Sequence, residues 1–71
     1  MGRTRNYQLT QTRKDKGWTL EKASEHVGCA FQTLSEWERG SWIPSGYSML
    51  MLARGYDKSI EDLFGKWLDT Q

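Results

Sequence analysis

Helix-breaking residues divide this chain into short segments. Glycine or proline occurs at Gly17, at Gly28, in residues 40–44 and in residues 55–58, and the segments between these breaks run about 7–12 residues. Segments of this length, joined by tight turns, are typical of short helices. No alternation of polar and apolar residues is long enough to indicate a strand. The spacing of the breaks therefore predicts an all-α fold.

The chain lacks the covalent and metal links that small domains often use. In a chain of 71 residues, a single apolar core leaves only about 3–5 kcal/mol of net stability. The one cysteine, Cys29, cannot close an internal disulfide, and with the one histidine, His26, it cannot build a structural zinc site. Stability must therefore come from tight packing, to which four tryptophans can contribute, or from a partner.

The sequence shows neither a membrane-spanning segment nor a secretory signal. No apolar run approaches the roughly 18 residues of a spanning helix. Arg3 and Arg5 are not followed by the apolar stretch of a signal peptide. The unpaired cysteine is typical of a reducing compartment. We therefore expect a cytoplasmic protein without a membrane partner.

Charge is unevenly distributed along the chain, although the net charge is only +1. Residues 1–16 carry five arginines or lysines against one aspartate, whereas residues 57–71 carry two lysines against four acidic residues. A basic front and an acidic tail favour contact with a polyanion near the N-terminus. The low net charge predicts modest, salt-sensitive non-specific binding to such a polyanion.

The first two segments have the caps and the periodicity of helices. Residues 6–16 form the first predicted helix, with Leu9 as its chief apolar anchor and Gly17 at a left-handed C-terminal stop. Thr19 is the expected N-cap of the second helix, and Glu21 lies in its first turn. The predicted buried face of that helix comprises Leu20, Ala23, Ser24 and Val27.

A third helix is predicted from about Phe31 to Arg39, after a turn that contains Gly28. Its apolar face carries Ala30, Leu34 and Trp37. Its opposite, polar face carries Gln32, Ser35, Glu36 and Arg39. Two short helices that cross at small side chains, with a polar outer face on the second, predict a helix-turn-helix at about residues 19–39. Such a face can enter a DNA major groove about 12 Å wide.

Two further helices complete the predicted domain. Ser45 is the expected N-cap of the fourth helix, whose buried stripe is Met49, Leu52, Ala53 and Tyr56. Ser59 caps the fifth, and Asp62 three residues later resembles a capping box. The apolar stripe of the fifth helix is longer than a core of this size needs and comprises Ile60, Leu63, Phe64, Trp67 and Leu68.

Over about residues 9–64, the chain resembles the Cro/repressor-type (XRE, lambda-repressor-like) helix-turn-helix regulators of phages and bacteria. The most specific feature is Glu38-Arg39-Gly40, followed after a gap of three residues by Pro44-Ser45. The other matching positions are Leu9, Arg13, Thr19, Gly28, Ser35, Leu52, Ala53, Ser59, Leu63 and Phe64. The resemblance implies a compact five-helix domain at residues 6–68, preceded by a basic arm at residues 1–5.

Several positions depart from the family pattern. Leu20 replaces the glutamine that usually contacts a phosphate, and Trp42 stands where a basic residue is common. Ala30 replaces a capping serine or threonine, at a cost of about 1 kcal/mol to the third helix. Asp57 replaces a turn glycine.

The resemblance also implies roles for individual side chains. Arg13 and Glu38 are expected to form a structural ion pair; the alternative is two solvated surface charges. Residues expected to contact DNA bases are Phe31, Gln32, Thr33 and Glu36, because these side chains can pair with base edges or touch a thymine methyl group. The alternatives are a solvated helix face and, for Phe31, the edge of the core. Residues expected to contact phosphates are Thr19, Ser35, Arg39, Ser41 and Trp42. Further candidates for contact with the DNA backbone are Tyr47, Arg3 and Arg5; the alternative for the two arginines is a disordered tail.

The function implied is sequence-specific binding of double-stranded DNA by a transcriptional regulator, expected to be a repressor of phage or bacterial type. Residues 31–39 would form the recognition helix in the major groove. Because one small module contacts few base pairs, we expect a homodimer on a palindromic operator. The candidate dimer surface is Phe64, Trp67 and Leu68; the alternative is that Trp67 and Leu68 close the core of the monomer.

Other classes of function are weighed against this one. The sequence shows no nucleophile–base pair, phosphate loop or metal set, so we expect no enzyme, no cofactor and no small-molecule ligand. The main alternative is a protein-interaction module on the same fold, such as an antitoxin. The chain could also be the N-terminal piece of a larger regulator.

Overall fold

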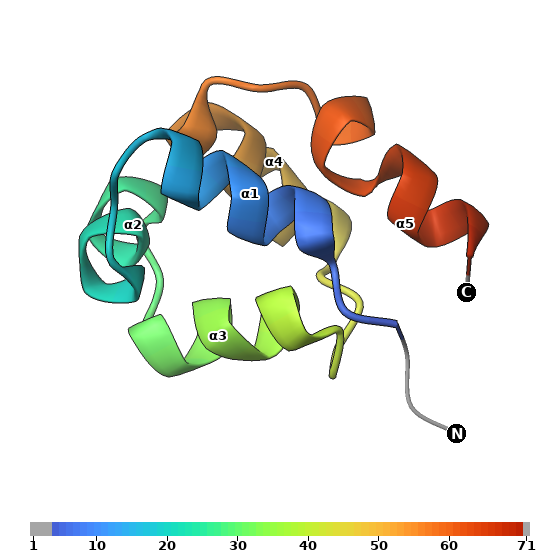
Figure 1. Ribbon diagram of the computed structural model, residues 1–71, viewed down its shortest axis with the longest axis horizontal. Helices are drawn as coiled ribbons and strands as arrows, with labels where there is room; N and C mark the ends of the chain where they lie inside the picture. Colours follow the sequence, from blue (N-terminus) through green and yellow to red (C-terminus); the bar gives the residue numbers. More distant parts are fainter. Residues whose placement is uncertain (1–3, 71) are drawn as a thin grey trace.

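The computed structural model describes residues 4–70. Its elements in chain order are α1 (Tyr7–Asp15), α2 (Leu20–Val27), α3 (Phe31–Arg39), α4 (Gly46–Tyr56), a π-helical turn η1 (Glu61–Gly65) and α5 (Lys66–Asp69). No strand occurs among the described residues, and the predicted all-α fold is confirmed. In Figure 1, α1 crosses in front of α4, with α2 at one end of the molecule, α5 at the other and α3 along the lower side.

Side-chain caps begin the helices where the sequence predicts them. Thr19 Oγ1 accepts a hydrogen bond of 3.1 Å from the Lys22 amide at the start of α2. Ser45 Oγ does the same for the Ser48 amide at 3.2 Å, at the start of α4. Ala30 stands at the N-cap of α3 and makes no side-chain cap bond. The uncapped start of α3 is thus the weakest of these helix beginnings.

Two backbone features set the positions of neighbouring helices. Gly28 adopts φ +90°, a left-handed conformation that lets α2 end and α3 turn away within three residues. Gly55 allows α4 to approach α2, because a Cβ at this position would lie 2.9 Å from Val27 Cα. Asp57 occupies the left-handed position after α4 (φ 56°), where the family pattern has glycine.

One core joins all the helices. α1 packs against α3 and η1, and α2 packs against α3 and α4. The buried apolar side chains are Leu9, Ala23, Val27, Leu34, Trp37, Leu52, Ala53, Tyr56, Leu63, Phe64 and Trp67. This set contains most of the predicted stripes, but the exposed Ala30 and the only half-buried Leu20 and Met49 lie outside it.

The C-terminal segment differs from the single predicted helix. The capping box forms, since the Asp62 amide donates to Ser59 Oγ at 3.0 Å. The helix then widens into η1 before α5. Within it, buried Asn6 Nδ2 donates to the Leu63 carbonyl at 3.2 Å, an insertion of the kind that locally distorts helices.

The structure corrects the expected dimer surface. Phe64 and Trp67 are 1% and 4% exposed, so they belong to the core of the monomer and are not available to a second chain. Trp67 Nε1 also donates to the Thr4 carbonyl, which ties this segment to the N-terminal end of α1. Leu68 remains exposed, as does Ile60, which the periodicity had placed on the buried stripe. A chain this short needs its large apolar side chains for its own core.

Candidate nucleic-acid interface

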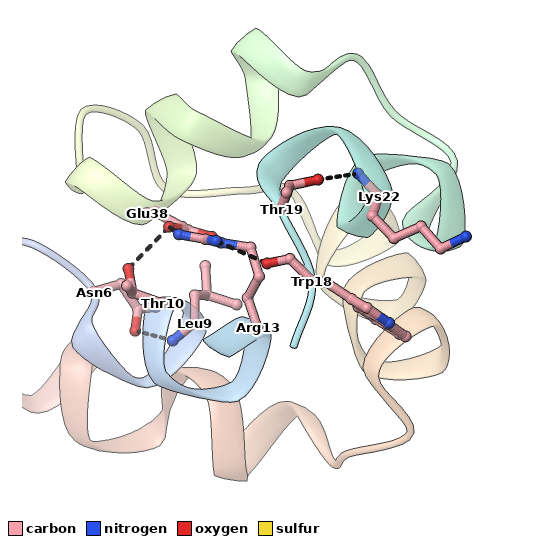
Figure 2. A network of polar contacts seen from close by, with 8 residues as sticks. All are labelled: Asn6, Leu9, Thr10, Arg13, Trp18, Thr19, Lys22 and Glu38. Carbon is pink, nitrogen blue, oxygen red and sulfur yellow. Dashed lines mark hydrogen bonds and ion pairs between the residues drawn. The ribbon is translucent and has the colours of Figure 1, made fainter. Parts of the chain in front are cut away.

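A buried ion pair fixes α3 to α1. Arg13 Nε lies 2.8 Å from Glu38 Oε2, and Arg13 Nη2 donates to Glu38 Oε1 at 3.2 Å (Figure 2). Glu38 is only 3% exposed, although it belongs to a largely polar helix. Such a bidentate contact fixes orientation as well as distance. The hydrogen bond to Glu38 raises the pKa of the Arg13 guanidinium above its ordinary value.

Two further hydrogen bonds extend this pair into a network. Thr10 Oγ1 donates to Glu38 Oε1 at 2.9 Å, and Arg13 Nη1 donates to the Trp18 carbonyl at 3.0 Å. In Figure 2 these groups gather between α1, α3 and the segment that leads into α2. The network therefore holds both helices of the helix-turn-helix against α1.

Tyr56 lies in the core, close enough to Glu38 and Arg13 for their charges to affect the pKa of its hydroxyl. Burial, and then the Glu38 carboxylate, raise the pKa of the Tyr56 hydroxyl well above its ordinary value. Among residues 4–70, no group accepts a hydrogen bond from this hydroxyl or donates one to it. The ring therefore stabilises the core, while its hydroxyl carries a desolvation cost.

The outer face of α3 presents three of the four expected base-contacting side chains. Phe31, Gln32 and Thr33 are exposed on the first turn of the helix. Glu36 is less accessible and forms an ion pair with Arg39 one turn later. The opposite face is anchored in the core through Leu34, Trp37 and Glu38. The first turn of α3 is therefore the part of the helix whose side chains are free to contact another molecule.

The expected phosphate-contacting residues do not form a single cluster. Thr19 is exposed at the N-terminus of α2, where unpaired backbone amides favour an anion. Ser41 and Trp42 are exposed in the loop after α3, and Tyr47 is exposed on α4. Arg5 is exposed beside α1, whereas Arg3 lies outside the described residues.

A groove between α1 and α3 adds residues that the sequence analysis missed. It has a volume of about 610 Å³ and is lined by, among others, Arg5, Gln11, Lys14, Leu20, Ser35 and Arg39. Among the described residues, Glu38 is the only acidic side chain that lines the groove, and it is paired with Arg13. Arg39 is paired with Glu36, so Arg5 and Lys14 supply the excess positive charge. The groove is therefore electropositive. Gln11 and Lys14 could have been recognised from their i, i+3 spacing on the polar face of the first predicted helix.

The described residues show no feature of a metal site or of a membrane span. No three His, Cys, Asp or Glu side chains of residues 4–70 are grouped so that they could hold a metal ion. None of the helices in this part of the chain has the length and apolarity needed to cross a bilayer.

Comparisons with known proteins agree with this geometry. A family model described as helix-turn-helix (HTH_3) matches residues 9–63. The HTH-type transcriptional regulator AnsR of Bacillus subtilis is 34% identical over 58 residues, which are 82% of this chain and 50% of AnsR. YgzD, an uncharacterised HTH-type transcriptional regulator of the same organism, is 33% identical over 55 residues, 78% of this chain and 80% of YgzD. The chain thus spans about half the length of the first of these relatives.

A solved structure shares the fold. The crystal structure of an HTH_3 family transcriptional regulator from Vibrio cholerae superimposes with a TM-score of 0.77 at 26% identity. The match covers 86% of this chain and 34% of that one. Together these similarities confirm the resemblance to XRE-type regulators: the chain belongs to the HTH_3 helix-turn-helix family.

Proposed function

We propose that this domain binds double-stranded DNA in a sequence-specific manner, with α3 in the major groove. The observation that carries the proposal is the division of α3 into two faces. Leu34, Trp37 and Glu38 are buried, while the exposed first turn carries side chains that can pair with base edges. A rigidly anchored helix with a free polar face is what direct readout of a groove requires.

The exposed side chains have distinct chemical uses in a groove. Gln32 is suited to the adenine N6 and N7 atoms, and Phe31 and Thr33 are suited to a thymine methyl group. Glu36 can accept a hydrogen bond from cytosine N4, but only after its ion pair with Arg39 breaks. Arg39 would then be released toward a phosphate.

The backbone of the DNA would follow the electropositive groove between α1 and α3. We propose phosphate contacts from Thr19, Ser35, Arg39, Ser41 and Trp42, with Lys14 as an addition from the structure. Because these contacts carry no sequence information, they would position α3 and set the salt dependence of binding.

We further propose a repressor of bacterial or phage type that acts in the cytoplasm, as a homodimer on a palindromic operator. Repression by occlusion of a promoter needs only tight binding at one site. A single domain of this size contacts too few base pairs for genomic selectivity, so two copies on half-sites one helical turn apart are expected.

Selection of binding sites from random double-stranded DNA tests the proposal. An enriched sequence with two-fold symmetry is expected, and a mobility shift on it should weaken by about 1–3 kcal/mol in Gln32→Ala if Gln32 reads a base. Ile60→Gln, a change at an exposed residue remote from α3 in sequence, is the control. No enrichment and no shift at low salt would refute the proposal and favour the protein-interaction alternative.

A further inference from the structure

One surface of the domain is free of charge and rich in exposed apolar side chains. Residues 40–53 contain no Asp, Glu, Lys or Arg, although such residues make up 27% of the chain. Trp42 and Ile43, in the loop after α3, are 61% and 44% exposed. Tyr47 and Leu50, on α4, are 75% and 40% exposed. We name these four side chains the loop–α4 patch.

The patch follows from how α4 is packed. Leu52, Ala53 and Tyr56 turn one face of the helix into the core. Tyr47 and Leu50, three residues apart, lie together on the opposite face. Pro44 is buried and fixes the loop just before α4, so Trp42 and Ile43 are held at the N-terminal end of the same helix. Half of the exposed large apolar side chains of residues 4–70 fall in these nine positions.

We propose that the loop–α4 patch is the surface through which two copies of this chain associate. In a two-fold dimer the same patch meets itself, so any net charge on it would face a like charge. A patch without charged residues avoids this repulsion. Its composition also fits, because the centres of protein interfaces are enriched in tryptophan and tyrosine and depleted of charge.

The size of the patch fits a small dimer interface. Trp42 and Tyr47 together expose roughly 250 Å², given that an aromatic side chain buries about 150–250 Å² when fully covered. With Ile43 and Leu50 the apolar area is on the order of 400 Å² per chain, which is about 60% of a 600–800 Å² face. The serines at positions 41, 45 and 48 and Arg54 border the patch and can form a polar rim.

The position of the patch is compatible with DNA binding, and this part of the argument rests on the proposed function. The loop begins directly after Gly40, which ends α3. A two-fold axis at the patch would bring the C-terminal ends of both α3 helices together and leave Gln32 and Thr33 uncovered. Both recognition helices could then face one side of a duplex. Self-association itself does not depend on DNA.

Sedimentation equilibrium over a range of protein concentrations tests the proposal without DNA. The unmodified chain should dimerise, and Leu50→Lys or Tyr47→Glu should raise the dissociation constant by roughly tenfold or more, because each places a like charge across the axis. Ile60→Lys is the matched control, since Ile60 is 37% exposed outside the patch. Circular dichroism of each variant shows that the fold is retained.

The outcomes separate this inference from the proposed function. A monomer at every concentration would overturn the inference, as would dissociation by Leu68→Lys but not by Leu50→Lys. A dimer that binds no DNA would leave the inference standing and refute the proposed function. Because Trp42 is also a proposed phosphate contact, the decisive variants are those of Tyr47 and Leu50. A dimer that persists unchanged in both Leu50→Lys and Tyr47→Glu would overturn the inference.

Discussion

The burial of the Arg13–Glu38 pair predicts that loss of either partner lowers the free energy of unfolding. Glu38→Leu removes the acceptor of three side-chain hydrogen bonds and leaves the Arg13 guanidinium without its counter-charge. Breaking one partner of a buried pair costs about 3–5 kcal/mol. Arg13 retains 14% side-chain exposure and can partly rehydrate, so we expect a value near 3 kcal/mol at the lower end of that range.

A double-mutant cycle isolates the pair from the effects of each substitution. Arg13→Met should destabilise at least as much as Glu38→Leu, because it leaves a carboxylate that is 4% exposed. The double variant replaces both charges by apolar groups and should be more stable than either single variant. We expect a coupling energy of about 2–3 kcal/mol.

The assay is urea unfolding followed by tryptophan fluorescence at one fixed protein concentration, since association would shift apparent stability. Because the net stability of the whole domain is only about 3–5 kcal/mol, the variants are measured in trimethylamine oxide, which strengthens the burial of apolar groups and so stabilises the folded state. The Glu36–Arg39 pair is the control and should show coupling of only about 0.3–0.5 kcal/mol, as one partly exposed i, i+3 pair does. Coupling below about 0.5 kcal/mol between Arg13 and Glu38 would refute the reasoning.

Three further predictions follow from single side chains. Ala30→Ser should supply the missing cap of α3 and raise the free energy of unfolding by about 0.5–1 kcal/mol relative to the unmodified chain. Tyr56→Phe should cost less than about 0.5 kcal/mol at neutral pH, because the buried hydroxyl has no partner among residues 4–70. Because the pKa of Tyr56 is raised in the folded state, the unfolded chain releases the phenolic proton first, so the free energy of unfolding falls as pH rises above the ordinary pKa of tyrosine and is unaffected below it. Tyr56→Phe should remove this part of the loss of stability at alkaline pH. An unchanged pH profile would contradict this prediction. Lys14→Gln should weaken binding to all DNA sequences alike and lower the salt slope by about one, whereas Lys58→Gln, outside the groove, should change neither.

The candidate site was recognisable from sequence where its signals are local. A threonine before an amphipathic run and a glycine after it mark the ends of α2, because capping and left-handed geometry depend on a few neighbouring residues. The polar outer face of α3 followed from helical periodicity alone. The groove residue Lys14 was missed because its proximity to α3 depends on how two helices cross.

The C-terminal segment likewise separates what local periodicity predicts from what only contacts between distant segments decide. Periodicity correctly made Leu63, Phe64 and Trp67 one apolar face, but it carries no information on what covers that face. Only the fold brings Asn6 to the Leu63 carbonyl, 57 positions away, and so assigns the face to the core of the monomer.

The sequence by itself therefore determined the class of fold, the limits of the first four helices and the polar face of the helix-turn-helix. These depend on backbone preferences and on a period of 3.6 residues, which are properties of short stretches. The Arg13–Glu38 pair was expected only through the family resemblance. The tertiary structure alone decided which apolar faces meet and which surface is left uncovered. Those results depend on contacts between distant segments, and contacts of this kind exist only once the chain has folded.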